Sequence, residues 1–245
     1  MIAADQPTCF TPEVLVALSS RSDGTMLDRA VGVHDGSVQS NRTAFCRLAG
    51  VDYGNVVFQR IVYDDTQTYD RIAEVGHADT ARYVSEVRGD ALFTSTPGVG
   101  LLLPVADCVA TVVYDPVRQS LALLHLGRHS SLTTLITKTI DLFTRHGSDP
   151  ADLLVWMSPN IHQSHYRMDY FDQADTPEWQ PFVKRHKDGL YIDLQGHNRR
   201  QFVKAGVRDL HIYDSPHNTA EHNGYFSHSQ GDTTGRFAVL AMVKP

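Results

Sequence analysis

The sequence predicts a mixed-sheet α/β or α+β domain, and three observations lead to this expectation. Short β-rich runs separated by turn residues are dense from residue 90 onward. A segment after residue 130 carries apolar residues at the 3.6-residue period of an amphipathic helix. No internal repeat, low-complexity tract or long linker interrupts the 245 residues. A chain of this length can bury a sizeable core, so we expect a single domain over residues 1–245.

The first half of the chain is predicted to hold short strands and one helix. The helix is expected over residues 40–49, ended by Gly50. A turn at residues 21–24 follows from its Asp-Gly step, which tolerates positive φ. The expected strands are residues 13–19, 55–63, 70–75 and 91–94.

The second half is predicted to alternate between strands and helices. One helix has a single apolar face between residues 132 and 143, with Ser130 or Ser131 as its cap and Gly147 near its end. A second helix is expected over residues 195–205, and residues 173–189 are interpreted as a surface helix and loop. The expected strands are residues 100–105, 109–114, 121–125, 153–157, 209–213 and 237–243.

Composition excludes several classes of function. Hydrophobic residues make up 42% and charged residues 20%, and the net charge is −6, so nucleic acid is not an expected partner. No apolar run is long enough to span a membrane, and the N-terminus lacks the pattern of a secretory signal. Three scattered cysteines predict no disulfide framework, and a reducing cytoplasm is the expected compartment.

The strongest local signal for chemistry is a cysteine and a histidine on consecutive predicted strands. Cys108 ends the sequence VADC, and His125 follows 17 residues later, before the predicted helix. Pairing of the two strands would bring the thiol and the imidazole together. Such a pair can act as nucleophile and base, or both groups can bind a metal such as zinc. Taken singly, each is more often a structural core residue, but the polar Asp107 within an apolar strand favours a functional site.

Several motifs in the same order along the chain resemble the laccase-domain (YfiH-type) family. They are DALFT at 90–94, VADC at 105–108, YDP at 114–116, HLG at 125–127, SPN at 158–160, the DL, N, Q and AGV positions over 193–207, FS at 226–227 and TGR at 234–236. Two weaker matches precede them, at 20–24 and 67–72. The likeness is collinear over nearly the whole chain.

This resemblance implies a layered α/β/β/α fold with mixed sheets. It also implies a zinc site built from two histidines and a cysteine, and small-molecule chemistry. Family activities include purine nucleoside phosphorolysis and adenosine deamination, and some members are described as copper-dependent polyphenol oxidases. By this likeness Cys108 and His125 map onto two zinc ligands, while the position of the third holds Tyr69.

Loss of one ligand would weaken a tetrahedral zinc site. Two states therefore stay open. In one, zinc is held through Cys108 and His125, with copper less expected, and the third ligand is replaced by Tyr69, His129 or His77. In the other, the pocket is metal-free and Tyr69 forms a hydrogen bond. Candidate residues for binding substrate or anion are Arg21, Arg128, His129, Asn160, Arg167 and His228, with Arg236 as a further anion ligand or a structural arginine.

Three functional hypotheses follow. The first is a divergent enzyme that acts on purine nucleosides by phosphorolysis or deamination, with Cys108, His125 and Tyr69 as catalytic residues. The second is a metal-free hydrolase or deamidase with Cys108 as nucleophile and His125 as base. The third is a small-molecule-binding protein without catalysis. The expected partners are a nucleoside and phosphate, and the chain is expected to be a monomer or a homodimer.

Overall fold

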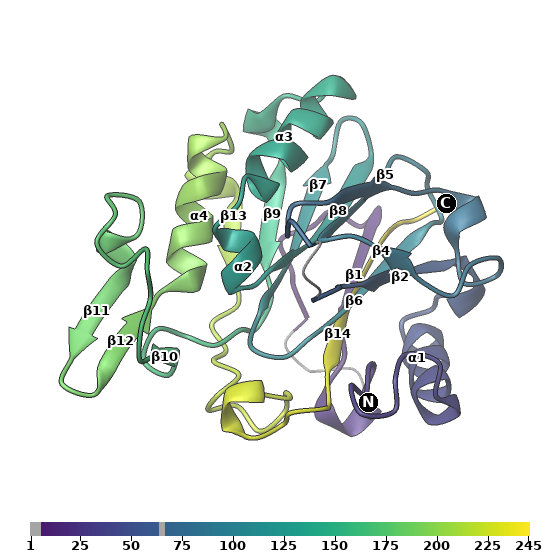
Figure 1. Cartoon of the computed structure of the whole chain (residues 1–245). Coiled ribbons are helices and arrows are strands. Elements are labelled where there is room, and N and C mark those ends of the chain that lie inside the picture. Colours follow the sequence, from purple (N-terminus) through teal and green to yellow (C-terminus); the bar gives the residue numbers. More distant parts are fainter. Residues whose placement is uncertain (1–5, 64–66) are drawn as a thin grey trace.

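Two β-sheets packed face to face form the centre of the molecule, and helices cover both outer surfaces (Figure 1). The computed structural model describes residues 6–63 and 67–245. The five-stranded sheet comprises, in spatial order, β1 (Val14–Leu18), β14 (Phe237–Val243), β6 (Gly100–Val105), β2 (Val56–Arg60) and β4 (Val87–Arg88). The six-stranded sheet comprises β13 (Ile212–Asp214), β9 (Leu154–Met157), β7 (Val109–Asp115), β8 (Ser120–Leu126), β5 (Ala91–Thr94) and β3 (Ile72–Glu74).

The strands of both sheets are apolar on both faces because each sheet is covered on both sides. In β6, Leu101 and Leu103 belong to the core between the sheets, whereas Leu102 packs on the opposite side beneath a helix. In β8, Leu123 faces the other sheet and Leu124 faces the outer helices. The period of two residues therefore divides each continuous apolar run between two separate cores.

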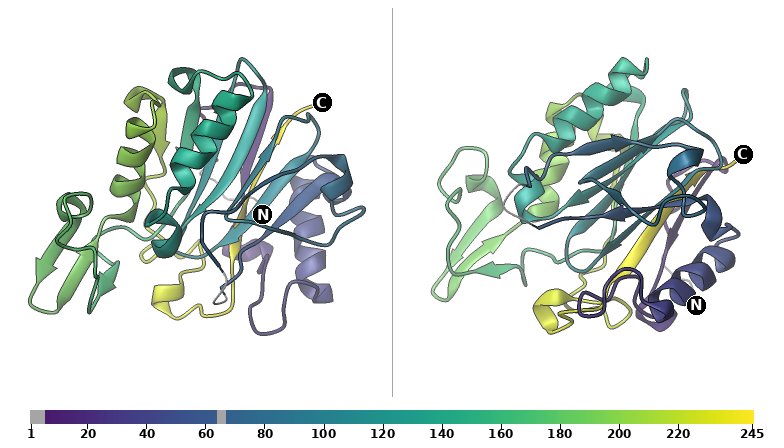
Figure 2. Two further views of the ribbon diagram at one scale, coloured as in Figure 1. Left: turned by 45° about the horizontal axis from the view of Figure 1, so that its top comes forward. Right: turned by 45° about the vertical axis from the view of Figure 1, so that its right-hand side comes forward.

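Helices complete the outer layers, as the two views of Figure 2 show. Helix α1 (Gly36–Leu48) packs on the five-stranded sheet through Phe45. Helices α3 (Leu135–Arg145) and α4 (Leu194–Lys204) pack on the six-stranded sheet, while α2 (Arg128–Ser131) is a single turn after β8. This arrangement confirms the predicted layered α/β/β/α fold with mixed sheets. No helix in the described part of the chain is both long and apolar enough to cross a bilayer.

Most predicted elements are present, with changed ends. Strands β5, β6 and β14 have the predicted bounds. Helix α1 begins four residues earlier than expected, because the Asp35 side chain accepts hydrogen bonds from the backbone N–H groups of Ser37 and Val38 and caps it there. The strand expected at 209–213 is a 3₁₀ turn followed by β13.

The surface helix expected within residues 173–189 is wrong. That segment ends in β11 (Val183–His186), which forms an antiparallel hairpin with β12 (Gly189–Ile192), and β10 (Arg167–Met168) joins on the other side of β12. The hairpin turns at Lys187 and Asp188, and β12 begins at Gly189, whose φ of +147° lies outside the range that other residues prefer. Strand pairing overrides the local preference of this polar segment, and the small sheet projects from the body (Figure 1).

The expected N-cap of the helix after His125, Ser130 or Ser131, is also wrong, whereas its expected end near Gly147 is confirmed. The helix is interrupted after Ser131 and restarts at Leu135. Ser130 lies inside the first turn, where its Oγ accepts a hydrogen bond from Gly127 N at 2.9 Å and donates one to His125 O at 2.7 Å. These two hydrogen bonds of Ser130 connect the turn to the end of β8, next to His125.

Candidate functional site

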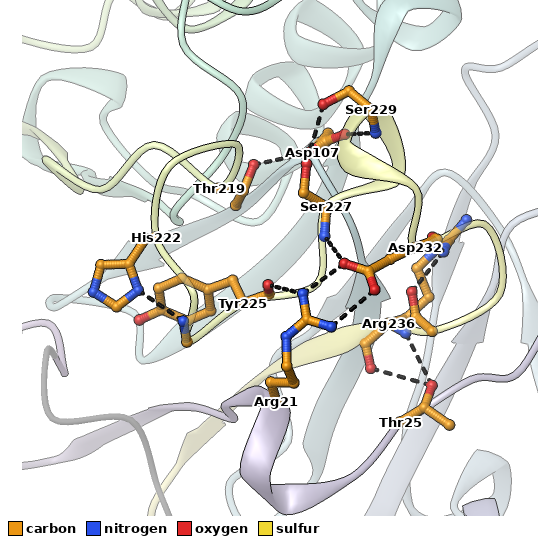
Figure 3. Close-up of polar contacts among 12 residues, drawn as sticks. Arg21, Thr25, Asp107, Thr219, His222, Tyr225, Ser227, Ser229, Asp232 and Arg236 are labelled. Carbon is orange, nitrogen blue, oxygen red and sulfur yellow. Dashed lines mark hydrogen bonds and ion pairs between the residues drawn. The ribbon is translucent and has the colours of Figure 1, made fainter.

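Cys108 lies in the short connection between β6 and β7, and its neighbour Asp107 fixes the shape of that connection. Asp107 has a positive φ of 72°, which an aspartate adopts more readily than most residues. Its buried carboxylate accepts three hydrogen bonds of 2.7 Å, from Thr219 Oγ1, Ser227 Oγ and the backbone N–H of Ser229 (Figure 3). The polar residue that stood out in the sequence therefore joins the Cys108 loop to the C-terminal segment.

His125 lies near the end of β8, where its neighbour β7 begins. Ala110 is its register partner, so Cys108 comes opposite Gly127. A β-carbon built on Gly127 would lie 2.9 Å from Cys108 Sγ and 3.4 Å from His125 Nε2. The side chains of Cys108 and His125 therefore both lie against the same side of Gly127. The structure brings the thiol and the imidazole together, as the pairing of consecutive strands predicted.

The surroundings of this pair favour uncharged side chains. Burial raises the pKa of the Cys108 thiol to about 12, and the negative Asp107 adds to the effect. Burial lowers the pKa of His125 to about 4, with smaller contributions from Arg236 and His129. At neutral pH the site therefore holds a thiol and a neutral imidazole. No described residue bonds to the buried Nδ1 of His125.

Cys108 and His125 border a cavity of about 540 Å³ at the ends of β2, β4, β6 and β8. Such a volume lies within the range typical of small-molecule sites. The polar and charged side chains that line it are Arg29, Gln59, Arg60, Tyr63, Glu86, Arg88, Cys108, His125, His228 and Arg236.

Two of these arginines lie at the Cys108 end. Arg236 is buried, and it donates from Nη1 to the backbone carbonyls of Asp232 and Gly235. No described residue accepts a hydrogen bond from its Nε or Nη2. Burial lowers the pKa of Arg236, and the nearby charge of Arg29 lowers it further. Both guanidinium groups also lower the pKa of Cys108. An anion bound here would relieve the repulsion between Arg29 and Arg236.

Of the residues predicted for the site, Cys108, His125, His228 and Arg236 line the cavity. Tyr69 lies beside it and stacks on His129 with ring centroids 4.6 Å apart. Tyr63 lies near both Tyr69 and His125, because its ring centroid is 6.1 Å from that of Tyr69 and 6.5 Å from that of His125. The exposed Arg128 contacts His129 at 3.3 Å at the start of α2.

Three other predicted residues lie outside the cavity lining and make structural contacts. Arg21 pairs with Asp232 and donates to Tyr225 O at 2.8 Å (Figure 3). Its guanidinium group also lies over the ring of Phe226. Asn160 is fully buried and donates to Ser158 O and to Gln195 Oε1. Arg167 is exposed and pairs with Asp169 and Asp188. Their assignment to substrate binding stays a prediction.

Most residues that line the cavity opposite Cys108 were not predicted from the sequence. Arg60 and Arg88 are register partners on β2 and β4, and both line the cavity. Strand β4 has only two residues, too few to produce a periodic pattern, so nothing in the sequence signalled Arg88. Arg29 lies in an irregular loop, with its guanidinium carbon 5.2 Å from the ring centroid of Tyr63. Only the end of the predicted strand at 55–63 pointed towards Arg60 and Tyr63.

The ligands expected for zinc are incomplete among the described residues. Cys108 and His125 could each donate to a metal, but residues 6–63 and 67–245 contain no cluster of three or more His, Cys, Asp or Glu side chains suited to hold one. A zinc site normally has three or four protein ligands. Tyr69, at the position of the third, is stacked on His129. These residues do not fit a complete zinc site, and we derive no step that passes through a metal.

Known proteins with similar sequences are named as phosphorylases. A purine nucleoside phosphorylase of Streptomyces coelicolor is 27% identical over 215 residues, which is 86% of this chain and 85% of that protein. One from Corynebacterium glutamicum is 27% identical over 216 residues, covering 87% and 84% of the two chains.

Solved structures give the same picture of the fold. YlmD from Geobacillus stearothermophilus matches with a TM-score of 0.81 at 25% identity, covering 96% of this chain and 94% of its own. The Bacillus licheniformis protein YfiH matches with a TM-score of 0.79 at 26% identity, covering 95% and 93%. The family model described as multi-copper polyphenol oxidoreductase laccase matches residues 19–244. This chain therefore belongs to the multi-copper polyphenol oxidoreductase laccase family.

Proposed function

We propose that this chain catalyses the phosphorolysis of purine nucleosides in the cavity above Cys108 and His125. In this reaction the C1′–N9 bond breaks, and its electron pair leaves with the base. An oxygen of phosphate forms the new bond to C1′, and the base takes up one proton. The observation that carries the proposal is one cavity that joins the Arg29 and Arg236 guanidinium groups to a neutral thiol and imidazole.

In this proposal Arg29 and Arg236 bind phosphate. Guanidinium groups hold phosphate oxygens by pairs of parallel hydrogen bonds, and Arg236 has Nε and Nη2 free of partners among the described residues. Because Arg236 is buried, its charge is weakly screened and attracts an anion strongly. Binding next to Cys108 would place the phosphate close to the reacting carbon, which lowers the entropic part of the barrier.

Cys108 and His125 would interact with the purine. Since their pKa values are shifted to about 12 and about 4, neither is charged at neutral pH. The thiol S–H and one imidazole N–H can then donate hydrogen bonds to ring nitrogens of the base, which gain negative charge as the glycosidic bond breaks. The relatives named as purine nucleoside phosphorylases support the same substrate class.

The test is release of free base from inosine or adenosine by purified protein, with and without phosphate. We expect phosphate-dependent release of the base, reduced at least 100-fold in Cys108→Ala and His125→Ala. Cys9→Ala and His186→Ala serve as matched controls, because Cys9 lies outside the cavity lining and His186 is exposed on β11. Absence of turnover in the wild type, or equal turnover in Cys108→Ala, would contradict the proposal.

The same assay separates the alternatives. Ammonia released from adenosine without phosphate would indicate deamination. A metal-free hydrolase with Cys108 as nucleophile would need a thiolate and an imidazolium, and the directions of both pKa shifts disfavour that charged pair. Retention of a nucleoside without conversion would indicate a binding protein.

A further inference from the structure

A second pair of arginines lines the cavity, away from Cys108. Arg60 and Arg88 are register partners on the parallel strands β2 and β4, so their side chains leave the sheet side by side. Both line the cavity. Arg236 directly precedes β14, on one side of β6, and the backbone N–H of Arg29 donates to Thr234 O in the same segment. Arg60 and Arg88 lie on β2 and β4, on the other side of β6. The two pairs therefore occupy different ends of one cavity.

The charges of the cavity wall are not balanced by the protein. The four arginines face a single carboxylate, that of Glu86. Glu86 lies 3.8 Å from Arg88 and 4.0 Å from His34. No carboxylate of the described residues forms an ion pair with Arg29, Arg60 or Arg236. This local excess of positive charge stands in a chain whose net charge is −6, and it favours a ligand with more than one anionic group.

One inorganic phosphate accounts for one arginine pair only. Arg29 and Arg236 lie at the Cys108 end, where the co-substrate phosphate of the proposed reaction must reach C1′. A neutral nucleoside would then leave Arg60 beside its ribose without an anionic partner, and Arg88 with Glu86 alone. A phosphoryl group on the 5′ oxygen would project from the ribose, away from the base, and could reach this second pair.

We infer that the substrate of this cavity is a purine nucleoside 5′-monophosphate, whose phosphoryl group is bound by Arg60 and Arg88. The inference rests on the proposed function and names its substrate class. Inorganic phosphate attacks C1′, the C1′–N9 bond breaks, and the base leaves with its electron pair and takes up one proton. The second product is a ribose with phosphate on both C1′ and C5′. The 540 Å³ cavity is of a size that admits such a ligand.

The experiment compares inosine with inosine 5′-monophosphate as substrates at saturating phosphate, with release of hypoxanthine as the readout. We expect kcat/KM to be at least tenfold higher for the monophosphate. In the double variant Arg60→Gln/Arg88→Gln, this preference should fall to less than threefold. Arg185→Gln is the matched control, because Arg185 is an exposed arginine on β11 paired with Asp175, and it should keep the wild-type preference. Circular dichroism and the thermal midpoint verify that the variants fold.

A wild-type enzyme that prefers inosine or treats both substrates alike would overturn the inference while leaving the proposed function intact. So would a double variant that lowers both activities equally. If neither substrate is converted, the proposed function fails, and calorimetry then decides the inference separately. Tighter binding of the monophosphate than of inosine, by at least tenfold and lost in the double variant, upholds it, whereas equal or undetectable binding overturns it.

Discussion

The sulfur of Cys108 lies 2.9 Å from the position that a β-carbon would occupy on Gly127. His125 Cε1 lies 3.1 Å from the same position. A β-carbon at this position would be too close to both atoms, so the side chains of Cys108 and His125 would have to move. A glycine is therefore required at the start of α2 for the thiol and the imidazole to meet, although its φ of −97° is open to any residue.

The first prediction concerns this close approach. Gly127→Ala should displace Cys108, His125 or both, because the new methyl group occupies the space between them. We expect base release to fall at least tenfold and the free energy of unfolding to fall by about 1–3 kcal/mol, measured by steady-state assay and urea unfolding. Gly36→Ala is the control, since a β-carbon there meets no atom within 4 Å. Full activity in Gly127→Ala would contradict the prediction, because it would show that activity does not need the close approach of Cys108 and His125 to Gly127.

The second prediction concerns the carboxylate that joins Cys108 to the C-terminal loop. Asp107→Asn retains a side chain that tolerates positive φ. Hydrogen bonds now reach both carboxylate oxygens, and the amide nitrogen that replaces one of them cannot accept. We expect a loss of about 1–3 kcal/mol in unfolding free energy, measured by urea denaturation. Asp141→Asn, at an exposed position on α3, should change stability by less than about 0.5 kcal/mol. Equal effects of the two substitutions would contradict a structural role for Asp107.

The third prediction contrasts Arg21, which the sequence predicted to bind an anion, with Arg29, which it did not indicate. Arg29→Gln should raise the KM for phosphate at least tenfold, because Arg29 lines the cavity beside Arg236. Arg21→Gln should change that KM less than threefold, because Arg21 is paired with Asp232 outside the cavity lining. Steady-state rates at varied phosphate measure both. A large effect of Arg21→Gln on KM, with stability unchanged, would restore Arg21 as an anion ligand.

The fourth prediction concerns the reactivity of the thiol. With its pKa raised to about 12, Cys108 is protonated at pH 8. Alkylation by iodoacetamide should then be at least about tenfold slower than that of a free cysteine, whose pKa is about 8.5, and should rise steadily with pH. Labelling of chelator-dialysed protein at pH 6.5–9.5, followed by peptide mass spectrometry, measures the rate. Rapid labelling near neutral pH would instead favour the nucleophilic hydrolase.

The fifth prediction concerns acid stability. Burial lowers the pKa of His197, which stacks on Trp179 at 3.5 Å, to about 4. An unfolded histidine titrates near pH 6.5 and binds protons that the folded chain excludes, so stability is lost as the pH falls from about 6.5 towards 4. Through His197, the free energy of unfolding should be about 2 kcal/mol lower at pH 5 than at pH 7.

The variant His197→Phe retains an aromatic ring at this position and removes the titration. Its free energy of unfolding should therefore fall less between pH 7 and pH 5 than that of the wild type, by urea denaturation at both values. The exposed His186 gives the control, because His186→Phe should leave the wild-type slope unchanged. An identical slope in His197→Phe and the wild type would show that His197 is not excluded from protonation.

Elements with local signals, and the proximity of Cys108 and His125, could be predicted from the amino-acid sequence. Apolar runs bounded by Gly and Pro predicted β5, β6 and β14 correctly, because strand pairing follows such runs. Cys108 and His125 could be paired because consecutive short strands usually lie next to each other. The interruption before α3 and the hairpin of β11 and β12 were not predicted. Strand β11 has the sequence VKRH, which lacks the alternation of apolar residues that indicates a strand.

The residues that surround Cys108 and His125 could not be predicted, because they come together only in the folded chain. Arg60 and Arg88 become neighbours through a two-residue strand that has no periodic signature. Arg236, which directly precedes the last strand, reaches the same cavity as Arg29, which lies in a loop 207 positions earlier in the sequence. A sequence encodes local conformation through nearby residues, whereas the charge of a cavity is the sum of side chains delivered by distant segments. The reactive pair was therefore predictable, and the cluster of arginines around it was not.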